Sequence, residues 1–307
     1  IEGRDSERSD EEWLAGLPET HKSFAAGVLE RAGLTAEGLE EDRRAKVRFA
    51  RNLQAGGAGK LLDVAFSHPI GLIANALGVP PPAMLERGKA AGVPVAALVG
   101  SREHAVAQVE AGVDILVAAG GEAGGHCGEV STLVLVPEVI EAVRPIGDVP
   151  VLAAGGIVTG RQMAACMAMG ATGAWTGSVW LTTAEAETSP VIREKLIRAT
   201  SRDTVRSRSR TGKPSRQLRS AWTEAWESGQ APEPLPMPLQ SLVSEPALAR
   251  IDKLSQGGHE GAAALATYWV GQGVGLMNQE TSVRAVMQEF QEDYLDACER
   301  LQATLGG

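Results

Sequence analysis

The chain has 307 residues, of which 44% are hydrophobic and 22% charged, with 36 glycines and a formal net charge of −9. This composition suits a globular protein with a large core; it excludes collagen, because the glycines show no three-residue period, and a wholly disordered chain. The acidic balance argues against general nucleic-acid binding, and no apolar run reaches the roughly 20 residues that cross a bilayer.

The first 60 residues are expected to form polar helices. A helix entry is expected at Pro18-Glu19-Thr20, and the glycine-rich break Ala55–Gly59 closes this segment. Residues 1–42 hold 12 acidic residues against four basic ones, so most of the negative charge lies here. The chain opens with Ile1-Glu2-Gly3-Arg4, the recognition sequence of a protease often used to remove fusion tags. A tag remnant or a fragment of a longer chain and a genuine mature start are both compatible with this opening, and no apolar segment marks the protein for export.

Five short apolar runs follow, and they alternate with amphipathic stretches. Runs that are apolar almost throughout suit the strands of a parallel sheet, because helices cover both faces of such a sheet. The expected strands span residues 70–77, 93–99, 113–119, 149–154 and 171–181. The expected helices between them span residues 81–91, 102–111, 136–145 and 160–169. This alternation predicts a parallel α/β fold.

Beyond residue 182 no further strands are expected. Helical patterns cover residues 184–199, 215–227 and 281–304. The proline-rich stretch 232–238 suits an extended crossing, because proline cannot continue a helix. The C-terminal part is therefore expected to be a helical appendage of the sheet.

Glycine-rich loops follow three of the expected strands. The first, Gly120–Gly128, contains His126; the second holds Gly155-Gly156 before a helix start at Gly160; the third spans Gly170–Ser178. Ligands of parallel α/β folds sit at the carboxyl ends of strands, where glycine lets the backbone approach closely. A glycine pair before a helix also offers free N–H groups and a positive dipole end to an anion. Any one loop could be a flexible turn, but the three together predict a ligand site with a phosphate subsite.

Residues 70–181 resemble the flavin-dependent nitronate monooxygenases, also called 2-nitropropane dioxygenases. The matching stretches are Glu122–His126 with Ser131–Pro137, Pro150–Ile157 with Gly160-Arg161, and Gly170–Ser178 with Glu185-Ala186. Weaker matches extend through Gly212-Lys213-Pro214 and Gly271-Gln272-Gly273 to the C-terminal helix. The resemblance implies a TIM (β/α)8 barrel that binds FMN, without a second flavin or a metal.

The resemblance also assigns roles to residues of the three loops. His126 falls on the catalytic base of the family, which removes the proton α to a nitro group before the flavin oxidises the carbanion and dioxygen reoxidises the flavin. An imidazole suits this role, since it titrates near neutral pH. The implied cofactor-binding residues are Gly124, Gly125, Gly155 and Gly156, with Trp175, Thr176, Gly177 and Ser178 at the phosphate. The implied partners are a small nitronate or nitroalkane and dioxygen, and a homo-oligomer is compatible with them.

Two departures from the family pattern bear on these expectations. Ala119 stands where members commonly carry a glutamine against the flavin, and the family's first strands have no match before Ile70. We therefore expect a barrel that is incomplete at its N-terminus, through truncation in preference to strands supplied by another chain. The expected parts are an acidic helical segment (1–60), a barrel core with the flavin site (61–200) and a helical extension that packs on the barrel (201–307).

Two alternatives to nitronate oxidation stay open. One is an NAD(P)H-dependent flavin reductase of the same superfamily that acts on an enoyl thioester or a quinone. The other is a catalytically silent scaffold that keeps the fold for assembly.

Several remaining signals are expected to be structural. The basic run 202–219 lacks interleaved aromatic residues, so we expect a solvated face or an arm over the site, and no nucleic-acid partner. Trp222 and Trp226 are expected to pack in a helical layer, and Cys127 is expected to be a bystander thiol. The three cysteines have no paired spacing, which indicates reduced thiols in the cytoplasm.

Overall fold

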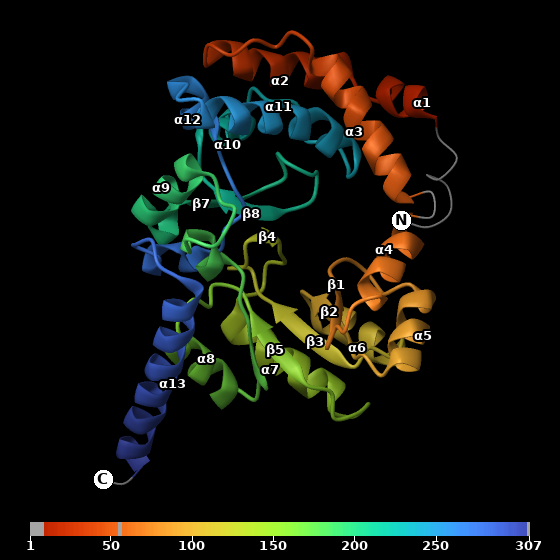
Figure 1. The fold of residues 1–307 in the computed structure, drawn as a ribbon. Coiled ribbons are helices and arrows are strands. Elements are labelled where there is room, and N and C mark those ends of the chain that lie inside the picture. The colour runs from red at the N-terminus through yellow and green to blue at the C-terminus, as the bar shows by residue number, and fades with distance from the viewer. Residues whose placement is uncertain (1–8, 55–56, 306–307) are drawn as a thin grey trace. The chain divides into compact units, whose positions relative to one another are not determined.

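The computed structural model describes residues 9–54 and 57–305 (Figure 1). The opening Ile1–Arg4 and the first part of the glycine-rich break, residues 55–56, lie outside the described residues. The chain forms two compact units. The helical unit comprises Ile1–Ser67, Ser189–Glu194 and Val205–Tyr268, and the sheet unit comprises His68–Thr188, Lys195–Thr204 and Trp269–Gly307.

The sheet unit is built on five parallel strands, which confirms the expected α/β fold and all five expected strands. Neighbouring strands pair in the order β1-β2-β3-β5-β6, with Leu116 of β3 opposite Val151 of β5. The strands are β1 (Ile73–Asn75), β2 (Val95–Val99), β3 (Ile115–Ala119), β5 (Val151–Ala154) and β6 (Gly173–Trp175). The last strand is shorter than expected, because the backbone leaves the extended conformation at Gly177 and continues as the 3-10 helix η1 (Ser178–Thr182).

Helices pack between and after these strands much as expected (Figure 1). They are α5 (Pro82–Ala91), α6 (Arg102–Glu110), α7 (Thr132–Val143), α8 (Gly160–Ala168), η2 (Ser201–Asp203), η3 (Gln272–Leu276) and α13 (Val283–Leu305). Helix α9 (Pro190–Arg198) is shared between the two units, which divide after Glu194. Helix α7 begins four residues before its expected start and contains Pro137. Proline removes only the N–H that would bond the Leu133 carbonyl, and Leu133 is exposed, so water can take its place.

The sheet carries a core on each face, as the continuous apolar runs predict. Leu116 and Ala118 pack with α7, where Leu135 and Val139 are fully buried. The alternate residues Val117 and Ala119 point to the other face, because successive side chains of a strand point in opposite directions. At its carboxyl end this second face leads to the glycine-rich loops.

The helical unit contains helices and, contrary to expectation, a pair of strands. Its helices are α1 (Asp10–Ala15), α2 (Glu19–Arg31), α3 (Leu39–Gln54), α4 (Gly57–Phe66), α10 (Ala221–Glu227), α11 (Leu239–Gln256) and α12 (Glu260–Leu265). Pro18 is the residue before α2, which confirms the expected helix entry. The strands β7 (Thr204–Ser207) and β8 (Ser215–Leu218) are neighbours in one sheet, so the helix expected over 215–227 is wrong for its first part. The buried residues of β8 include Ser215 and Gln217, so no apolar alternation marked it.

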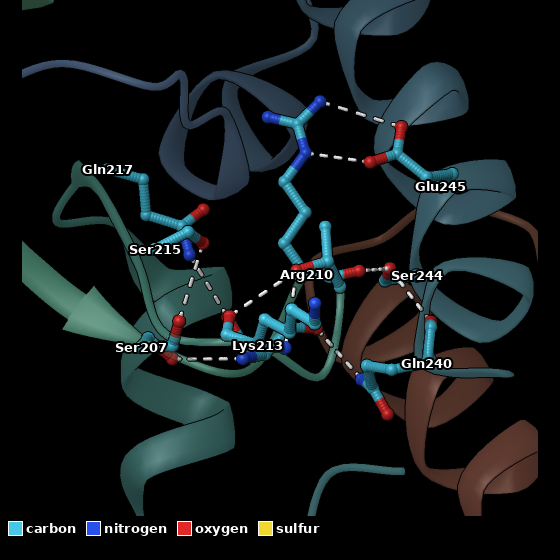
Figure 2. Close-up of polar contacts among 10 residues, drawn as sticks. Ser207, Arg210, Lys213, Ser215, Gln217, Gln240, Ser244 and Glu245 are labelled. Atoms are coloured by element: carbon cyan, nitrogen blue, oxygen red, sulfur yellow. Dashed lines mark hydrogen bonds and ion pairs between the residues drawn. The ribbon is translucent and has the colours of Figure 1, made fainter. Parts of the chain in front are cut away.

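Buried polar residues join the β7–β8 segment to α11 in the helical unit. Figure 2 shows the guanidinium of Arg210 against the carboxylate of Glu245, with Nε donating to Oε1 at 2.8 Å. The Gln240 amide donates to the Ser209 carbonyl oxygen at 2.8 Å, and the Ser244 hydroxyl donates to the Arg210 carbonyl oxygen. Arg210 belongs to the basic run, so this part of the run is paired inside its own unit.

The expected tryptophan packing is confirmed. Trp222 and Trp226 are buried, and their ring centroids lie 6.0 Å apart. Phe24 of α2 meets Trp226 edge to face at 4.9 Å. In the described part of the chain, every helix is too short or too polar to traverse a lipid bilayer.

Candidate functional site

The three glycine-rich loops of the sheet unit meet around one cavity of about 320 Å³. It lies where β2, β3, β5 and β6 end, which is the edge at which parallel folds bind ligands. Its walls combine glycine backbone with apolar side chains. The lining residues are Leu98, Ala119, Ala123, Gly124, Gly125, His126, Ala154, Gly155, Gly156, Ile157, Val158, Trp175, Gly177, Ser178, Leu181 and Trp269.

All the site residues expected from the sequence line this cavity except Thr176. Thr176 lines a separate apolar cavity of about 510 Å³ between α8 and α13. Its hydroxyl oxygen accepts a hydrogen bond from the Trp180 indole nitrogen at 3.1 Å. Thr176 is therefore turned away from its neighbours Trp175 and Gly177.

Glycine is required at these loop positions, because neighbouring backbone approaches closely at Gly124 and because Gly155 and Gly156 have positive φ values. A Cβ on Gly124 would lie 2.7 Å from the carbonyl carbon of Val270. Gly155 and Gly156 have φ values of +111° and +70°, which L side chains rarely adopt. Backbone therefore forms this wall of the cavity, and any other residue here would displace it.

The N–H groups at the N-terminus of α8, where the sequence pattern predicted an anion site, already donate hydrogen bonds to side chains of the protein. The Arg161 N–H donates to Asp293 Oδ2 of α13 at 2.7 Å. Gln162 Oε1 accepts the N–H groups of Val158 and Thr159 at 2.9 and 3.1 Å. A carboxylate from α13 thus takes the place that was expected for a ligand anion.

Ser178 supplies a better-placed donor. Its Oγ accepts the Gly271 N–H at 2.9 Å, which leaves the single hydroxyl proton free to donate toward the cavity. Ser178 also begins η1, and the residue before it, Gly177, has no side chain to cap this start. This corner of the cavity is therefore rich in donors.

His126 brings the one imidazole of the cavity lining. Its ring centroid lies 6.2 Å from that of Trp269, with the planes tilted by 47°. Trp269 was missed from the sequence, although it stands two residues before the Gly271-Gln272-Gly273 match that pointed to this segment. Ala119 lines the cavity where the family resemblance implied a glutamine.

A second cavity of about 340 Å³ also has Gly155 and Gly156 in its lining, together with Cys166. Burial and the charge of Glu122 raise the pKa of the Cys166 thiol. Cys127 lines neither cavity. No group of three histidine, cysteine or acidic residues in the described chain is arranged to hold a metal ion.

Comparison with known proteins gives this architecture a family. A family model described as nitronate monooxygenase matches residues 27–293. Rv1533 of Mycobacterium tuberculosis, which its name presents as a candidate monooxygenase, is 52% identical over 93% of this chain and 75% of its own length. An octahydroindene-carboxyl-CoA dehydrogenase of the same organism is 32% identical over 71% of this chain and 63% of its own. The chain thus spans between three-fifths and three-quarters of these two relatives.

A solved structure agrees with the fold. The nitroalkane oxidase of Streptomyces ansochromogenes superposes with a TM-score of 0.70 and 24% identity, over 92% of this chain and 78% of that one. The likeness supports the expected TIM-barrel type for the five parallel strands. Since the family model spans most of the sequence, including all three loops, the chain belongs to the nitronate monooxygenase family of oxidoreductases.

Proposed function

We propose that the protein is an FMN-dependent oxidoreductase that oxidises nitronates or nitroalkanes with dioxygen, with His126 as the base. One observation carries the proposal: three glycine-rich loops converge on a cavity that holds a single imidazole and a donor-rich corner at Ser178. The family membership supports the same reaction. The relatives also support an oxidoreductase, and the reduced thiols favour the cytoplasm.

The residues present fit FMN. Gly124, Gly155 and Gly156 line the cavity with backbone alone, and their close packing and positive φ values exclude side chains there, which suits a flat ring against the loops. The Ser178 hydroxyl and the start of η1 offer donors to a phosphate. Trp175 and Trp269 supply apolar walls. Bound FMN would supply a two-electron acceptor that dioxygen can regenerate.

His126 would accept the proton from the carbon next to the nitro group. A neutral imidazole can do so at working pH, and the apolar walls around it exclude water that would compete for that proton. A substrate supplied already as the nitronate needs no such transfer. For that substrate His126 would orient the anion.

A second candidate is supported by one relative. The indene-carboxyl-CoA dehydrogenase acts on a CoA thioester, so a flavin reductase or dehydrogenase of thioesters is the alternative reaction. Anaerobic mixing with NADH or NADPH separates the two candidates. Rapid bleaching of the flavin absorbance would favour the reductase, and no bleaching would favour the nitronate oxidase.

The proposal is tested by titrating the purified protein with FMN and measuring flavin fluorescence and the visible spectrum. We expect saturable binding, together with oxygen uptake on addition of nitroalkane or nitronate. His126→Ala is expected to lower kcat/KM for the nitroalkane about 100-fold and to affect the nitronate far less, because only the neutral substrate needs the base.

The matched control is His104→Ala, an exposed histidine of α6, which should leave both reactions unchanged. A protein that takes up no FMN contradicts the proposal. Unchanged turnover of the nitroalkane in His126→Ala would mean that another group is the base.

A further inference from the structure

Glu122 ties together the segments that form the flavin cavity, although its side chain does not line that cavity. Its carboxylate Oε2 accepts the Thr132 N–H at 2.8 Å and lies 3.0 Å from the Thr132 hydroxyl, at the first residue of α7. Its main-chain oxygen accepts the Gln272 N–H at 2.9 Å. One residue thus holds the start of a helix, the loop that carries His126, and the segment that contains Gly271.

Thr132 extends this link to the end of β5. The residue is buried, and its hydroxyl oxygen lies 3.2 Å from the Ala154 carbonyl oxygen and 3.1 Å from that of Gly155. A hydroxyl has one proton, and a carboxylate is a stronger acceptor than a carbonyl. The Glu122 carboxylate therefore orients the Thr132 hydroxyl between the two loops.

Thr132 is packed closely against glycines of two loops. A Cβ on Gly120 would lie 2.3 Å from the Thr132 hydroxyl oxygen, and one on Gly155 would lie 2.7 Å from it. A Cβ on Gly156 would lie 3.1 Å from the Glu122 Cβ. Two loops that line the cavity are thus packed against the same pair of side chains.

The charge of Glu122 is met by backbone. The carboxylate sits at the N-terminus of α7, where a helix presents unbonded N–H groups and the positive end of its dipole. An acceptor oxygen is what the two Thr132 donors require, and a neutral amide oxygen of the same shape can supply it.

We propose that Glu122 is a positioning residue, which holds the His126 loop and the Gly155-Gly156 turn at the spacing that the flavin requires. The proposal rests on the proposed flavin function. Glu122 acts through Thr132 and the loop backbone, and touches neither the cofactor nor the substrate.

The test compares Glu122→Ala with Glu122→Gln, each studied well below its own melting temperature. FMN affinity from fluorescence titration is expected to fall about tenfold in Glu122→Ala, which is worth roughly one or two hydrogen bonds, and to stay within about threefold in Glu122→Gln. At saturating FMN, the visible circular dichroism of the flavin should change in Glu122→Ala and return to the wild-type form in Glu122→Gln. Glu110→Ala, at an exposed position of α6, should match the wild type.

A double-mutant cycle examines the route through Thr132. Thr132→Val removes the hydroxyl, and adding it to Glu122→Ala should weaken FMN binding no further, because the two side chains act as one link. Fully additive losses would overturn the proposal. Wild-type affinity and flavin dichroism in Glu122→Ala would overturn it as well.

Hydrogen exchange of the flavin-free protein separates this proposal from the proposed function. Amides of residues 120–128 and 155–158 should exchange faster in Glu122→Ala and at the wild-type rate in Glu122→Gln. If the wild type binds no FMN, the flavin function fails, and the exchange rates still report whether Glu122 holds the loops. Unchanged exchange in Glu122→Ala would contradict the positioning role whatever the flavin does.

Discussion

Cys166 illustrates how a side chain takes its chemistry from its surroundings. The residue is 5% exposed, and both burial and the nearby charge of Glu122 disfavour its thiolate, so its pKa is raised. The thiolate is the nucleophilic form of cysteine. Cys166 is therefore expected to be inert, whereas Cys127 and Cys298 are only partly buried.

Alkylation with iodoacetamide should show this order. From pH 7 to pH 9, Cys127 and Cys298 should be modified before Cys166, as measured by mass spectrometry of peptides over time. Because the raised pKa keeps Cys166 protonated in the fold, its stabilising effect is present below the ordinary cysteine value of about 8.5 and is lost as the pH rises through the folded pKa. Cys166→Ala should remove this loss of stability at high pH. Modification of Cys166 as fast as Cys298 would contradict the prediction.

Individual residues of the site could be predicted where glycine marked them. The loop glycines and His126 lie in short runs directly after strands, so the sequence pattern located them. Thr176 lines the other cavity, because side chains alternate across an extended segment, and its expected role at the phosphate stays a prediction. Trp269 and Leu98 come from segments distant in the sequence, and only the folded chain brings them to His126.

At the start of α8, its contact with α13 combines a close approach of backbone with a charged hydrogen bond. A Cβ on Gly160 would lie 2.0 Å from the Phe290 carbonyl oxygen, so the two helices meet almost without side chains. Asp293 accepts the Arg161 N–H at 2.7 Å and forms an ion pair with its guanidinium at 2.6 Å. Arg161 is 61% exposed, so the bond to the N–H matters more than the ion pair.

Asp293→Ala is expected to lower the free energy of unfolding by about 1–2 kcal/mol, since it removes the acceptor at the start of α8. Urea denaturation measures this change. Asp296→Ala, an exposed aspartate of the same helix, is the matched control and should stay within about 0.5 kcal/mol of the wild type. Equal values for the two variants would mean that Asp293 does not cap α8.

Helices and strands could be predicted from the sequence where the side chains that they bury are apolar. The five parallel strands follow from continuous runs of valine, leucine, isoleucine and alanine, because both faces of the sheet are covered. Strand β8 buries Ser215 and Gln217 in place of apolar residues, and its pattern therefore resembled a helix. The early start of α7 was hidden by Pro137, which is more typical of a first helical turn.

The charges of the whole molecule are distributed so that the basic run has partners nearby. Arg208 pairs with Glu233, and Arg210 pairs with Glu245. The chain as a whole carries −9. The phosphate backbone of a nucleic acid would have to displace these carboxylates from the arginines and overcome the net negative charge of the protein.

Binding to DNA is therefore expected to be negligible. Fluorescence anisotropy of a labelled duplex of about 20 base pairs should show no saturation below about 10 µM protein at roughly 150 mM salt, which is within the range of non-specific contacts. A submicromolar dissociation constant with a steep salt dependence would contradict this expectation.

The expected division of the chain into three parts, with boundaries at residues 60 and 200, stays a prediction.

The buried polar network between α11 and the β7–β8 segment restricts which substitutions the chain can accept there. Ser209, Gln217, Gln240 and Ser244 are all inaccessible, and Gln240 and Ser244 bond to main-chain oxygens of residues 209 and 210. If α11 slid by one residue, these donors would be buried without acceptors, and new apolar packing would not offset that loss of free energy. The helix and the strands therefore have one alignment, and the four positions are free to change only together.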